Sequence, residues 1–328
     1  MKQRTLGNTG LKVSELSLGG GQFYSGSTVE QVRDVVQTAF AAGINYIDTA
    51  AGYGDSERLL GQALADIDHP CIISTKLGGY PQPFDPRNPE ILRTSVEHSL
   101  QLLHRDYIDI LMIHEPDRPR QYAWWTDWEN FTGPVLEVLE QLKAEGIIRF
   151  TGLGGTTAYE MAHIINTGRF DVVLTAFNYS LLWREAEIAV IPAAKAHNMG
   201  IIVGSPLQQG ALAQRYDEQI AHGARWLSPP RRYQYKALYS LLDELGMSII
   251  ELSMRFVISN PDISCVLTGA RTPQELEENL TAVEKGPLSA DVLQRLDELY
   301  EMVPFRPFEE PFGLPFNSEY QGPGMAGR

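Results

Sequence analysis

The chain has 328 residues, of which 43% are hydrophobic and 21% are charged, an ordinary composition for a globular protein. Its formal net charge is −14, and no cluster of Lys and Arg offsets it. Binding to nucleic acid or to an anionic membrane is therefore not expected, since both need a basic face. No run approaches the roughly 20 apolar residues of a membrane span, and the N-terminus lacks a secretory apolar core. Cys71 and Cys265 lie in strand-like apolar runs and are expected to be buried thiols in a reduced compartment, which predicts a cytoplasmic protein.

The chain opens with two short alternating segments around Gly7-Asn8-Thr9-Gly10, a pattern typical of a β-hairpin. Strand-like apolar runs and helix-like amphipathic runs then alternate along the chain. The predicted strands are Leu16–Leu18, Asn45–Asp48, Cys71–Thr75, Ile108–Ile113, Phe150–Leu153, Val172–Thr175, Gly200–Gly204 and Ser264–Thr268. The predicted helical segments are Thr28–Ala42, Ser56–Ala65, Pro89–Leu103, Pro134–Glu145, Ala158–Thr167, Arg184–His197, Pro230–Ile258 and Pro273–Val283. Pro230–Ile258 is expected to be two helices, broken near Gly246-Met247-Ser248.

These strand–helix units predict the fold. The strands are short, continuously apolar and rich in Ile, Val and Leu, as expected of parallel strands covered on both faces. Without a tandem repeat, such units favour an α/β fold of the (β/α)8 TIM barrel type, with the hairpin at its bottom and residues 1–328 as a single domain. A doubly wound open sheet is the alternative. It would require a G-x-G-x-x-G motif after an early strand, and the glycines of "SLGGGQF" lack that spacing.

Three loops exceed the ordinary connection length and follow the C-terminal ends of strands, where barrel enzymes build their sites. They are Gly78–Asn88, Glu115–Gly133 and Pro206–Ser228. The C-terminal tail from Val303 is rich in Pro and Phe and has no helical period. We expect it to be an extended segment that packs along the barrel surface; a tail that binds a partner is the alternative.

Polar side chains stand at the ends of three successive predicted strands. Asp48 follows "INYI", Lys76 follows "CIIST" and His114 follows "DILMI". Tyr53 lies between two glycines in the loop after Asp48. Taken singly, each has an ordinary interpretation: a helix cap, a solvated lysine, a core histidine and a surface tyrosine. On a barrel they converge on one pocket, where four polar residues of complementary kinds predict a catalytic site.

These side chains suit proton transfer at a carbonyl or alcohol oxygen. The phenol of Tyr53 has an ordinary pKa of about 10. We expect the Lys76 ammonium to lower that pKa, and Asp48 to keep the lysine charged and oriented. His114 can hydrogen-bond a carbonyl oxygen, so Tyr53 is the candidate general acid or base. None of the four supplies a hydride, which predicts a cofactor.

At these residues the chain resembles the aldo-keto reductase superfamily. "GINYIDTAAGYGDSERLLGQAL" matches the family's Asp-Thr-Ala…Tyr-Gly…Glu-x-x-x-Gly signature, "ISTKLG" its lysine motif and "LMIHEPD" its histidine motif. "SPLQQGAL" and "VLTGARTPQELEENL" resemble its two nicotinamide-nucleotide motifs. The resemblance covers most of the chain and implies a (β/α)8 barrel that binds NAD(P)H without a Rossmann fold. It also implies a catalytic tetrad of Asp48, Tyr53, Lys76 and His114.

The resemblance further implies which residues bind the nucleotide. They are Gly21, Gln22, Asp48, Gly155, Asn178, Ser205, Leu207, Gln209, Gly210, Gly269, Arg271, Glu275, Glu278 and Asn279. The residues from Gly21 to Asn178 are expected to contact the nicotinamide half of the nucleotide. Those from Ser205 to Gly210 are expected to contact the pyrophosphate. The remaining ones surround the adenosine, where a helix N-terminus is a ready anion site.

The chain departs from the family pattern around the nicotinamide. Gly154-Gly155 stands where many relatives have a Ser-Asn pair that binds the carboxamide, so we expect backbone groups or Asn178 to replace those contacts. Ala176 stands in place of a frequent Gln, and Glu115 in place of a frequent Trp after the histidine.

A further departure concerns the choice of cofactor. Glu275 occupies a position that is neutral in many relatives that bind NADP, and its charge would repel a 2′-phosphate. Arg271 would attract the same phosphate. The resemblance to the family therefore favours NADP(H) as the cofactor only weakly here, and NAD(H) remains an alternative.

The loop Glu115–Gly133 contains "YAWWTDWENF", in which Trp124, Trp125 and Trp128 are too close together for one helix face. We expect them to pack the loop onto the barrel. Trp124 and Trp125 are also candidates for the wall of a substrate pocket, as Tyr53 and His114 are at its reactive end.

Three functions fit these features. The first is NAD(P)H-dependent reduction of an aldehyde or ketone, and the second is NAD(P)-dependent oxidation of an aldose at its anomeric carbon. The third is a non-catalytic subunit that binds the nucleotide and regulates a partner, a role that does not require Lys76 and His114 together. A metal site is not expected, since a barrel hydrolase should carry several His and acidic ligands at its strand ends and only His114 and Asp48 qualify.

Overall fold

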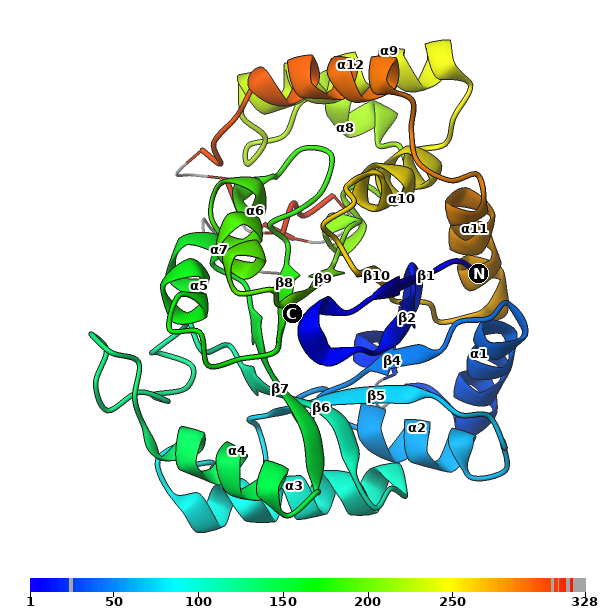
Figure 1. The fold of residues 1–328 in the computed structure, drawn as a ribbon. Coiled ribbons are helices and arrows are strands. Elements are labelled where there is room, and N and C mark those ends of the chain that lie inside the picture. Colours follow the sequence, from blue (N-terminus) through cyan, green and yellow to red (C-terminus); the bar gives the residue numbers. More distant parts are fainter. Residues whose placement is uncertain (24–25, 308–309, 312, 317–318, 321–328) are drawn as a thin grey trace.

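Eight parallel strands close into a barrel in the computed structural model, which describes residues 1–23, 26–307, 310–311, 313–316 and 319–320 (Figure 1). The strands follow chain order around the barrel, and the last pairs with the first to close it. They are β3 (Leu16–Gly19), β4 (Tyr46–Asp48), β5 (Ile72–Leu77), β6 (Ile108–His114), β7 (Ile148–Gly155), β8 (Val172–Ala176), β9 (Gly200–Gly204) and β10 (Cys265–Thr268). The predicted (β/α)8 barrel is confirmed, and the open doubly wound sheet is excluded.

Helices surround the barrel, most of them along its outside (Figure 1). They are α1 (Val29–Ala41), α2 (Ser56–Leu64), α3 (Pro89–Leu103), α4 (Pro134–Ala144), α5 (Ala158–Ile165), α6 (Glu185–Ile188), α7 (Val190–Ala196), α8 (Asp217–His222), α9 (Pro229–Leu245), α10 (Ile249–Ser259), α11 (Pro273–Glu284) and α12 (Ala290–Glu301). The side chains of Thr28, Asn88 and Ser248 accept hydrogen bonds from the first turns of α1, α3 and α10. These N-caps satisfy backbone N–H groups that have no partner within the helix, which is why the helices begin there.

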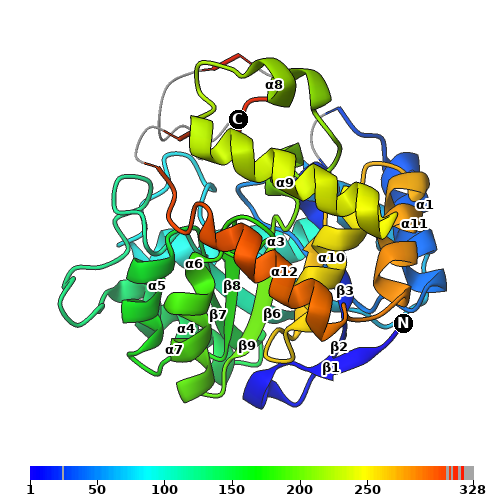
Figure 2. The ribbon, with the colours of Figure 1, turned by 90° about the horizontal axis from the view of Figure 1, so that it is seen from above.

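The N-terminal hairpin closes the bottom of the barrel, as predicted. β1 (Gln3–Thr5) and β2 (Lys12–Ser14) pair in antiparallel fashion. Leu6 and Val13 are fully buried in one cluster with residues of the barrel interior such as Ile110. Figure 2 shows the hairpin at one end of the barrel and α8 and α9 at the other. Because apolar side chains fill the N-terminal mouth, a site has to be built at the C-terminal mouth.

Some helices differ from the prediction. The segment Arg184–His197 is divided into α6 and α7 at Ala189, whose φ of −124° and ψ of −62° are not helical. The expected break between α9 and α10 lies at Gly246, which is left-handed with φ of 62°. α8 and α12 were not predicted. α12 begins at an N-cap, Ser289, and buries apolar residues at helical spacing, a pattern that is present in the sequence.

Two residues of α2 fix this helix beside β5, where Lys76 lies. Glu57 is buried, and Thr75 Oγ1 donates a hydrogen bond to its Oε1 at 2.5 Å. A Cβ on Gly61 would lie 1.9 Å from the carbonyl oxygen of Leu102 in α3, so only glycine permits this approach of the two helices. The Glu-x-x-x-Gly spacing thus holds α2 against both β5 and α3.

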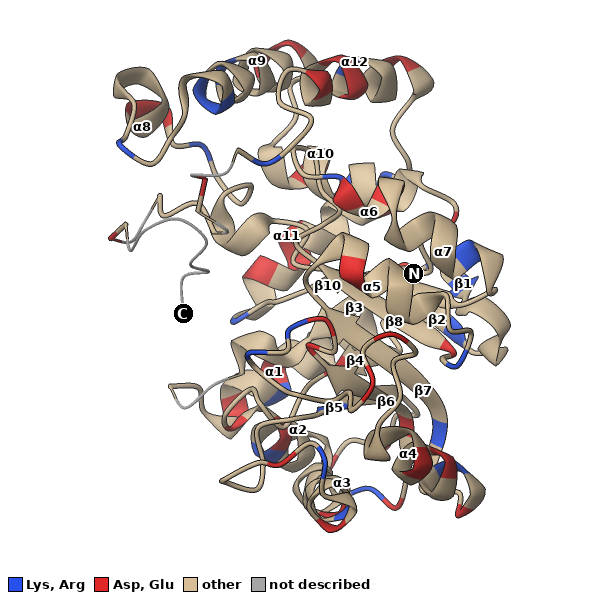
Figure 3. Ribbon diagram, turned by 90° about the vertical axis from the view of Figure 1, so that its left-hand side faces the viewer, with Lys and Arg blue, Asp and Glu red and all other residues tan. Residues whose placement is uncertain are grey.

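Acidic and basic residues occur along most of the outer helices (Figure 3). Cys71 and Cys265 are buried and free, as predicted. In the part of the chain that the structure describes, no helix has the length and apolar character of a membrane span.

Candidate active site

Tyr53 lies in the turn between β4 and α2, at the C-terminal mouth of the barrel. Its N–H donates to the carbonyl oxygen of Ala50 at 3.0 Å, and Gly54 has φ of 59°, a conformation that favours glycine. Ser56 Oγ donates to the carbonyl oxygen of Gly20 at 2.8 Å, which ties the start of α2 to the end of β3. The two glycines flanking Tyr53 therefore belong to a tight turn that places the phenol over the mouth.

Lys76 and Asp48 form a buried ion pair beneath Tyr53. Lys76 Nζ donates to Asp48 Oδ2 at 2.6 Å and to the carbonyl oxygen of Thr49 at 2.8 Å. Ser74 Oγ donates to the other carboxylate oxygen of Asp48 at 2.6 Å. Lys76 Nζ lies 4.7 Å from the centre of the Tyr53 ring. Burial alone would lower the pKa of Lys76, but the charge of Asp48 and the Tyr53 phenol raise it overall, so the lysine is charged.

The pKa of Tyr53 does not move in the expected direction. Burial raises it, and the charge of Lys76, which lowers it as predicted, is the smaller effect. The net shift is upward because the free-energy cost of removing the phenolate from water exceeds the stabilisation that the single nearby cation provides. Tyr53 is therefore a protonated phenol at neutral pH, ready to donate its proton.

His114 is neutral in this site. Burial lowers its pKa to about 3, and the positive charge of Lys76 adds to that shift. Its ring meets that of Tyr53 edge-on, with the centres 5.5 Å apart. Nδ1 of His114 is buried and has no hydrogen-bond partner among the described residues. A neutral imidazole can donate one ring N–H, so His114 can bind a carbonyl oxygen without charge repulsion from Lys76.

The two tryptophans predicted as pocket walls do not have that role. Trp124 and Trp125 are 0% exposed, and their indole N–H groups donate to the carbonyl oxygens of His114 (2.9 Å) and Pro116 (2.8 Å). They hold the loop against the end of β6, so the substrate-binding prediction for both is corrected. Tyr122 from the same loop is partly exposed instead, and its ring centre lies 6.4 Å from that of His114. Its position was not evident from the sequence.

The nicotinamide contacts expected of Gly155 and Asn178 near the end of β7 remain a prediction. Gly155 is buried, and a Cβ there would lie 2.4 Å from Met161 Sδ and 2.6 Å from Asp117 Oδ1. Asn178 is buried as well, and its amide donates to the carbonyl oxygen of Thr156 at 3.1 Å. Neither residue is among those that line the cavity. Gly154 leaves room for the Lys76 side chain, because a Cβ at this position would lie 3.3 Å from the Lys76 side chain.

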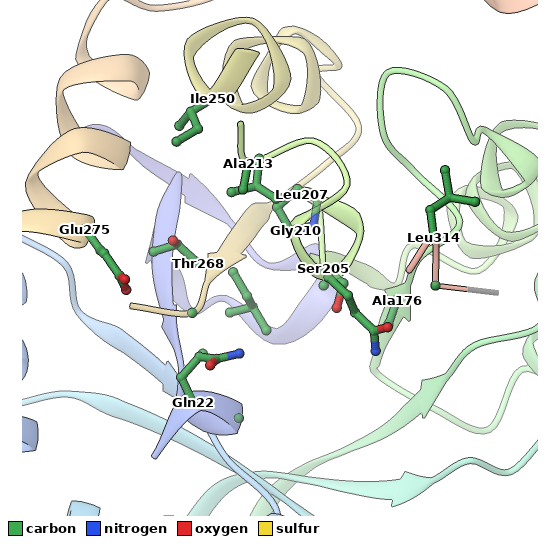
Figure 4. A pocket seen from close by; sticks show the side chains of 18 of the residues that line it. Gln22, Ala176, Ser205, Leu207, Gly210, Ala213, Ile250, Thr268, Glu275 and Leu314 are labelled. Carbon is green, nitrogen blue, oxygen red and sulfur yellow. The ribbon is translucent and has the colours of Figure 1, made fainter. Parts of the chain in front are cut away.

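A cavity of about 930 Å³ opens beside Tyr53 and Asp48 (Figure 4). The predicted cofactor residues that line it are Gly21, Gln22, Asp48, Ser205, Leu207, Gln209, Gly210, Gly269, Arg271, Glu275, Glu278 and Asn279. Figure 4 shows Glu275 at one side of the cavity and Ala176 at the other. Its volume is at the upper end of the roughly 300–1,000 Å³ typical of small-molecule and cofactor sites. The structure therefore brings four segments that lie far apart in the chain into one pocket.

The far end of this cavity carries an ion pair and an unsatisfied acceptor. Glu275 Oε2 accepts a hydrogen bond from the backbone N–H of Arg271 at 2.8 Å, and its Oε1 lies 3.5 Å from Arg271 Nη2. Asn279 donates to the carbonyl oxygen of Glu275 at 2.7 Å. Its Oδ1 is buried and has no hydrogen-bond partner within the described part of the chain. A buried acceptor left in this way is ready for a ligand donor.

The C-terminal tail forms one wall of the cavity, which sequence reasoning missed. Pro311, Gly313, Leu314, Pro315 and Phe316 all line it. Figure 4 shows Leu314 on the side of Ala176. The expectation that the tail packs against the barrel is met at Phe316, which is 7% exposed.

Two contacts anchor this wall at its ends. Arg231 Nε donates to Glu310 Oε2 at 2.7 Å, with both side chains almost completely buried. Phe316 stacks on Tyr216 with ring centres 4.1 Å apart and meets Trp226 edge-on at 4.9 Å. Pro311 and Gly313 to Pro315 are thus held over the pocket from both sides.

No group of three or more His, Cys, Asp or Glu side chains in the described ranges could hold a metal ion. The phenol, the lysine–carboxylate pair and the imidazole together suit proton transfer at a carbonyl or alcohol oxygen.

Comparison with known proteins agrees with this geometry. Residues 15–301 match the model of the "Aldo/keto reductase family". The chain is 30% identical to "L-galactose dehydrogenase" of Arabidopsis thaliana, over 92% of this chain and 94% of that protein. It is also 30% identical to "NADH-specific methylglyoxal reductase" of Escherichia coli (strain K12), over 89% and 96%. The solved "aldo-keto reductase AKR11C1 from Bacillus halodurans (holo form)" superposes with a TM-score of 0.73, at 26% identity, over 91% of this chain and 96% of that one. The chain belongs to the aldo/keto reductase family.

Proposed function

We propose that this protein is an NAD(P)H-dependent oxidoreductase that reversibly reduces an aldehyde or ketone to an alcohol, with Tyr53 as the general acid and base. The observation that carries the proposal is the arrangement around the phenol. A buried Lys76–Asp48 pair lies beneath Tyr53, and neutral His114 stands edge-on to it. A non-catalytic regulatory subunit would not need this complete set.

Each residue has a distinct task in the reaction. His114 donates a hydrogen bond to the carbonyl oxygen and fixes its direction. Tyr53 gives that oxygen a proton, and Lys76 stabilises the phenolate left behind while Asp48 keeps the lysine oriented. The nicotinamide cofactor, when bound, supplies or accepts the hydride. Because burial raises the pKa of Tyr53, the protonated form needed for reduction dominates at neutral pH, and oxidation should require a higher pH.

The cavity residues fit a dinucleotide. The buried Oδ1 of Asn279 is an acceptor without a partner among the described side chains, and an adenine amino group could satisfy it. Arg271 is already paired with Glu275, and Glu278 adds a second carboxylate to the cavity lining. This charge balance supports NAD(H), against the weak preference for NADP(H) that the sequence suggested. We expect the protein to work in the cytoplasm on a small carbonyl compound or sugar.

Oxidation of an aldose at its anomeric carbon is the second candidate, favoured by the similarity to L-galactose dehydrogenase. The same residues would act in the reverse direction, with Tyr53 accepting the hydroxyl proton.

The experiment has two parts. NADH and NADPH are first titrated by nicotinamide fluorescence, and the parent and Tyr53→Phe are then assayed with aldehydes in one direction and aldoses in the other. Tyr53→Phe keeps the ring but removes the proton donor, so nucleotide binding should be nearly unchanged while turnover falls by roughly 10²–10⁴-fold. A loss of less than about tenfold with the best substrate would show that Tyr53 is not the acid.

A further inference from the structure

Two buried hydroxyl groups in the barrel interior connect by hydrogen bonds to the candidate catalytic residues. Tyr46 Oη lies 2.7 Å from Ser74 Oγ, and Ser74 Oγ donates to Asp48 Oδ1 at 2.6 Å. The other carboxylate oxygen of Asp48 accepts a hydrogen bond from Lys76, which lies beneath the ring of Tyr53. Tyr46, Ser74, Asp48 and Lys76 are all buried, so little water competes with these contacts. We call Tyr46 and Ser74 the hydroxyl pair.

Two adjacent strands place the hydroxyl pair under the lysine–carboxylate pair. Side chains two positions apart in a strand point to the same side of the sheet. Tyr46 and Asp48 have this spacing in β4, as Ser74 and Lys76 have in β5, and Asp48 is opposite Ser74 in the register of the two strands. Tyr46 packs with other residues of the barrel interior. The patterns Tyr-x-Asp and Ser-x-Lys therefore direct all four side chains into the barrel.

The hydrogen bonds of the hydroxyl pair can run in one direction only. A serine hydroxyl carries a single hydrogen, and Ser74 uses it toward Asp48, whose ionised carboxylate can only accept. Tyr46 is therefore the donor to Ser74. Burial and the charge of Asp48 raise the pKa of Tyr46 well above its ordinary value, so the phenol keeps the hydrogen that it donates. Each donation polarises the next hydroxyl group and strengthens the hydrogen bond to Asp48.

The packing of Tyr46 does not require its hydroxyl group. The ring belongs to an apolar cluster that includes Ile110, Met112 and Ile202, and a phenylalanine ring would fill the same space. A hydroxyl group in such a cluster has to give up its hydrogen bonds with water. The contact with Ser74 replaces them and links Tyr46 to the carboxylate.

Asp48 is the titratable group that connects Tyr46 with the reacting centre. Asp48, Cys265 in β10 and Asp109 in β6 are the titratable groups that act on Tyr46. Burial raises the pKa of the Cys265 thiol to about 12, so this group is neutral. Asp109 is already paired with Arg149, with Oδ1 and Nη1 2.6 Å apart. The influence of Tyr46 on the site therefore passes through Ser74 and Asp48.

The negative charge of Asp48 opposes formation of the Tyr53 phenolate. The charge of Lys76 lowers the pKa of Tyr53, whereas the charges of Asp48 and Glu115 raise it. His114 stands edge-on to the Tyr53 ring and is neutral. A hydrogen bond donated to the Asp48 carboxylate disperses its charge, so the phenolate becomes more stable.

We propose that Tyr46 and Ser74 are positioning residues that control how readily Tyr53 gives up its proton, acting through Asp48 and Lys76. The inference rests on the proposed function, since it concerns the proton that Tyr53 transfers. With the hydroxyl pair intact, Asp48 holds Lys76 in place while part of its negative charge is taken up by Ser74. Without the pair, the full charge of Asp48 acts on Tyr53, and proton donation becomes slower.

Ser74→Ala and Tyr46→Phe each remove one hydroxyl group and add no atoms to the core. Reduction is measured with the aldehyde that the parent turns over fastest, at a saturating concentration of the preferred nucleotide and over a range of pH. Ser74→Ala should move the basic limb of the kcat profile upward by about one pH unit and lower kcat by roughly 3- to 10-fold. Tyr46→Phe acts one hydrogen bond further away, so its shift should be about half a unit and its loss of kcat roughly twofold to fourfold. The nucleotide Kd should stay within about twofold of the parent value in both variants, because neither side chain lines the cavity.

The double variant separates this role from a general effect on the fold. Tyr46→Phe should add nothing to the pH shift of Ser74→Ala, because Tyr46 acts only through Ser74. Tyr179→Phe is the matched control. It removes the hydroxyl group of another buried tyrosine, whose partner is Asn260, and should change neither kcat nor its pH profile.

A pH profile of Tyr46→Phe or Ser74→Ala that matches the parent would overturn the inference, as would additive losses in the double variant. Either result leaves the proposed function intact, provided that Tyr53→Phe loses its activity. If the parent binds the nucleotide but reduces no aldehyde and oxidises no aldose, the proposed function itself fails, and this inference fails with it.

Discussion

Replacing Glu115 with glutamine should stabilise the protein at neutral pH relative to the parent. Burial, with the charge of Asp117, raises the pKa of this carboxyl from 4.5 to about 7. A carboxyl with a raised folded-state pKa contributes stability that is fully present below about 4.5 and is lost as the pH rises through about 7. Glutamine has no proton to lose, so the variant should not show this decline.

The size of the effect follows from proton linkage. With a pKa of 4.5 in the unfolded chain and about 7 in the folded one, the contribution of Glu115 falls by about 2–3 kcal/mol between roughly pH 5 and pH 8. The free energy of unfolding of Glu115→Gln minus that of the parent should therefore increase by about 2–3 kcal/mol over the same range. A change of that size is easily resolved in a denaturation curve.

Urea unfolding followed by fluorescence is a suitable assay, since the chain contains 5 tryptophans. Parent and variant are compared at several pH values across this range, and Glu129→Gln serves as the control for removal of an exposed charge. Parallel pH dependences of parent and Glu115→Gln would refute the reasoning, because Glu115 would then ionise near its ordinary pKa.

Lys76→Met should abolish most turnover and destabilise the fold by roughly 3–5 kcal/mol, since Asp48 would remain as a buried charge without a partner. Adding Asp48→Asn to this variant should restore its resistance to urea but not its activity. Restored activity would contradict the proposed role of Lys76. Glu275→Gln should strengthen NADPH binding several-fold more than NADH binding in fluorescence titrations, because a like charge near the 2′-phosphate costs on the order of 1 kcal/mol; an unchanged ratio would mean that the carboxylate faces elsewhere. Phe316→Ala should raise the substrate KM or the nucleotide Kd several-fold by releasing the tail wall, whereas Phe305→Ala, which alters an exposed side chain of the same tail, should change neither.

The hydrophobic pattern determined the architecture. Short, continuous apolar runs that alternate with amphipathic segments are typical of buried parallel strands, so the eight strands and the hairpin were predicted close to their observed bounds. In a closed parallel barrel the C-terminal ends of all strands meet at one mouth. Chain order alone therefore predicted that Asp48, Tyr53, Lys76 and His114 would come together, and the structure places them so.

Only the tertiary structure decided how the residues around these four are used. Trp124 and Tyr122 are two positions apart, yet one is fully buried and the other faces His114, because packing against the end of β6 orients the loop. Thr156, far along the chain, becomes the partner of Glu115.

The position of the tail and the pKa of Tyr53 were likewise decided by tertiary packing. The tail became a wall of the cavity through Phe316 and its aromatic partners on other elements, and no local pattern encodes such partners. The pKa of Tyr53 depends on the balance between burial and one neighbouring charge. A sequence shows which faces are apolar and which chemical groups are present, but desolvation and contacts between remote segments exist only once the chain has packed.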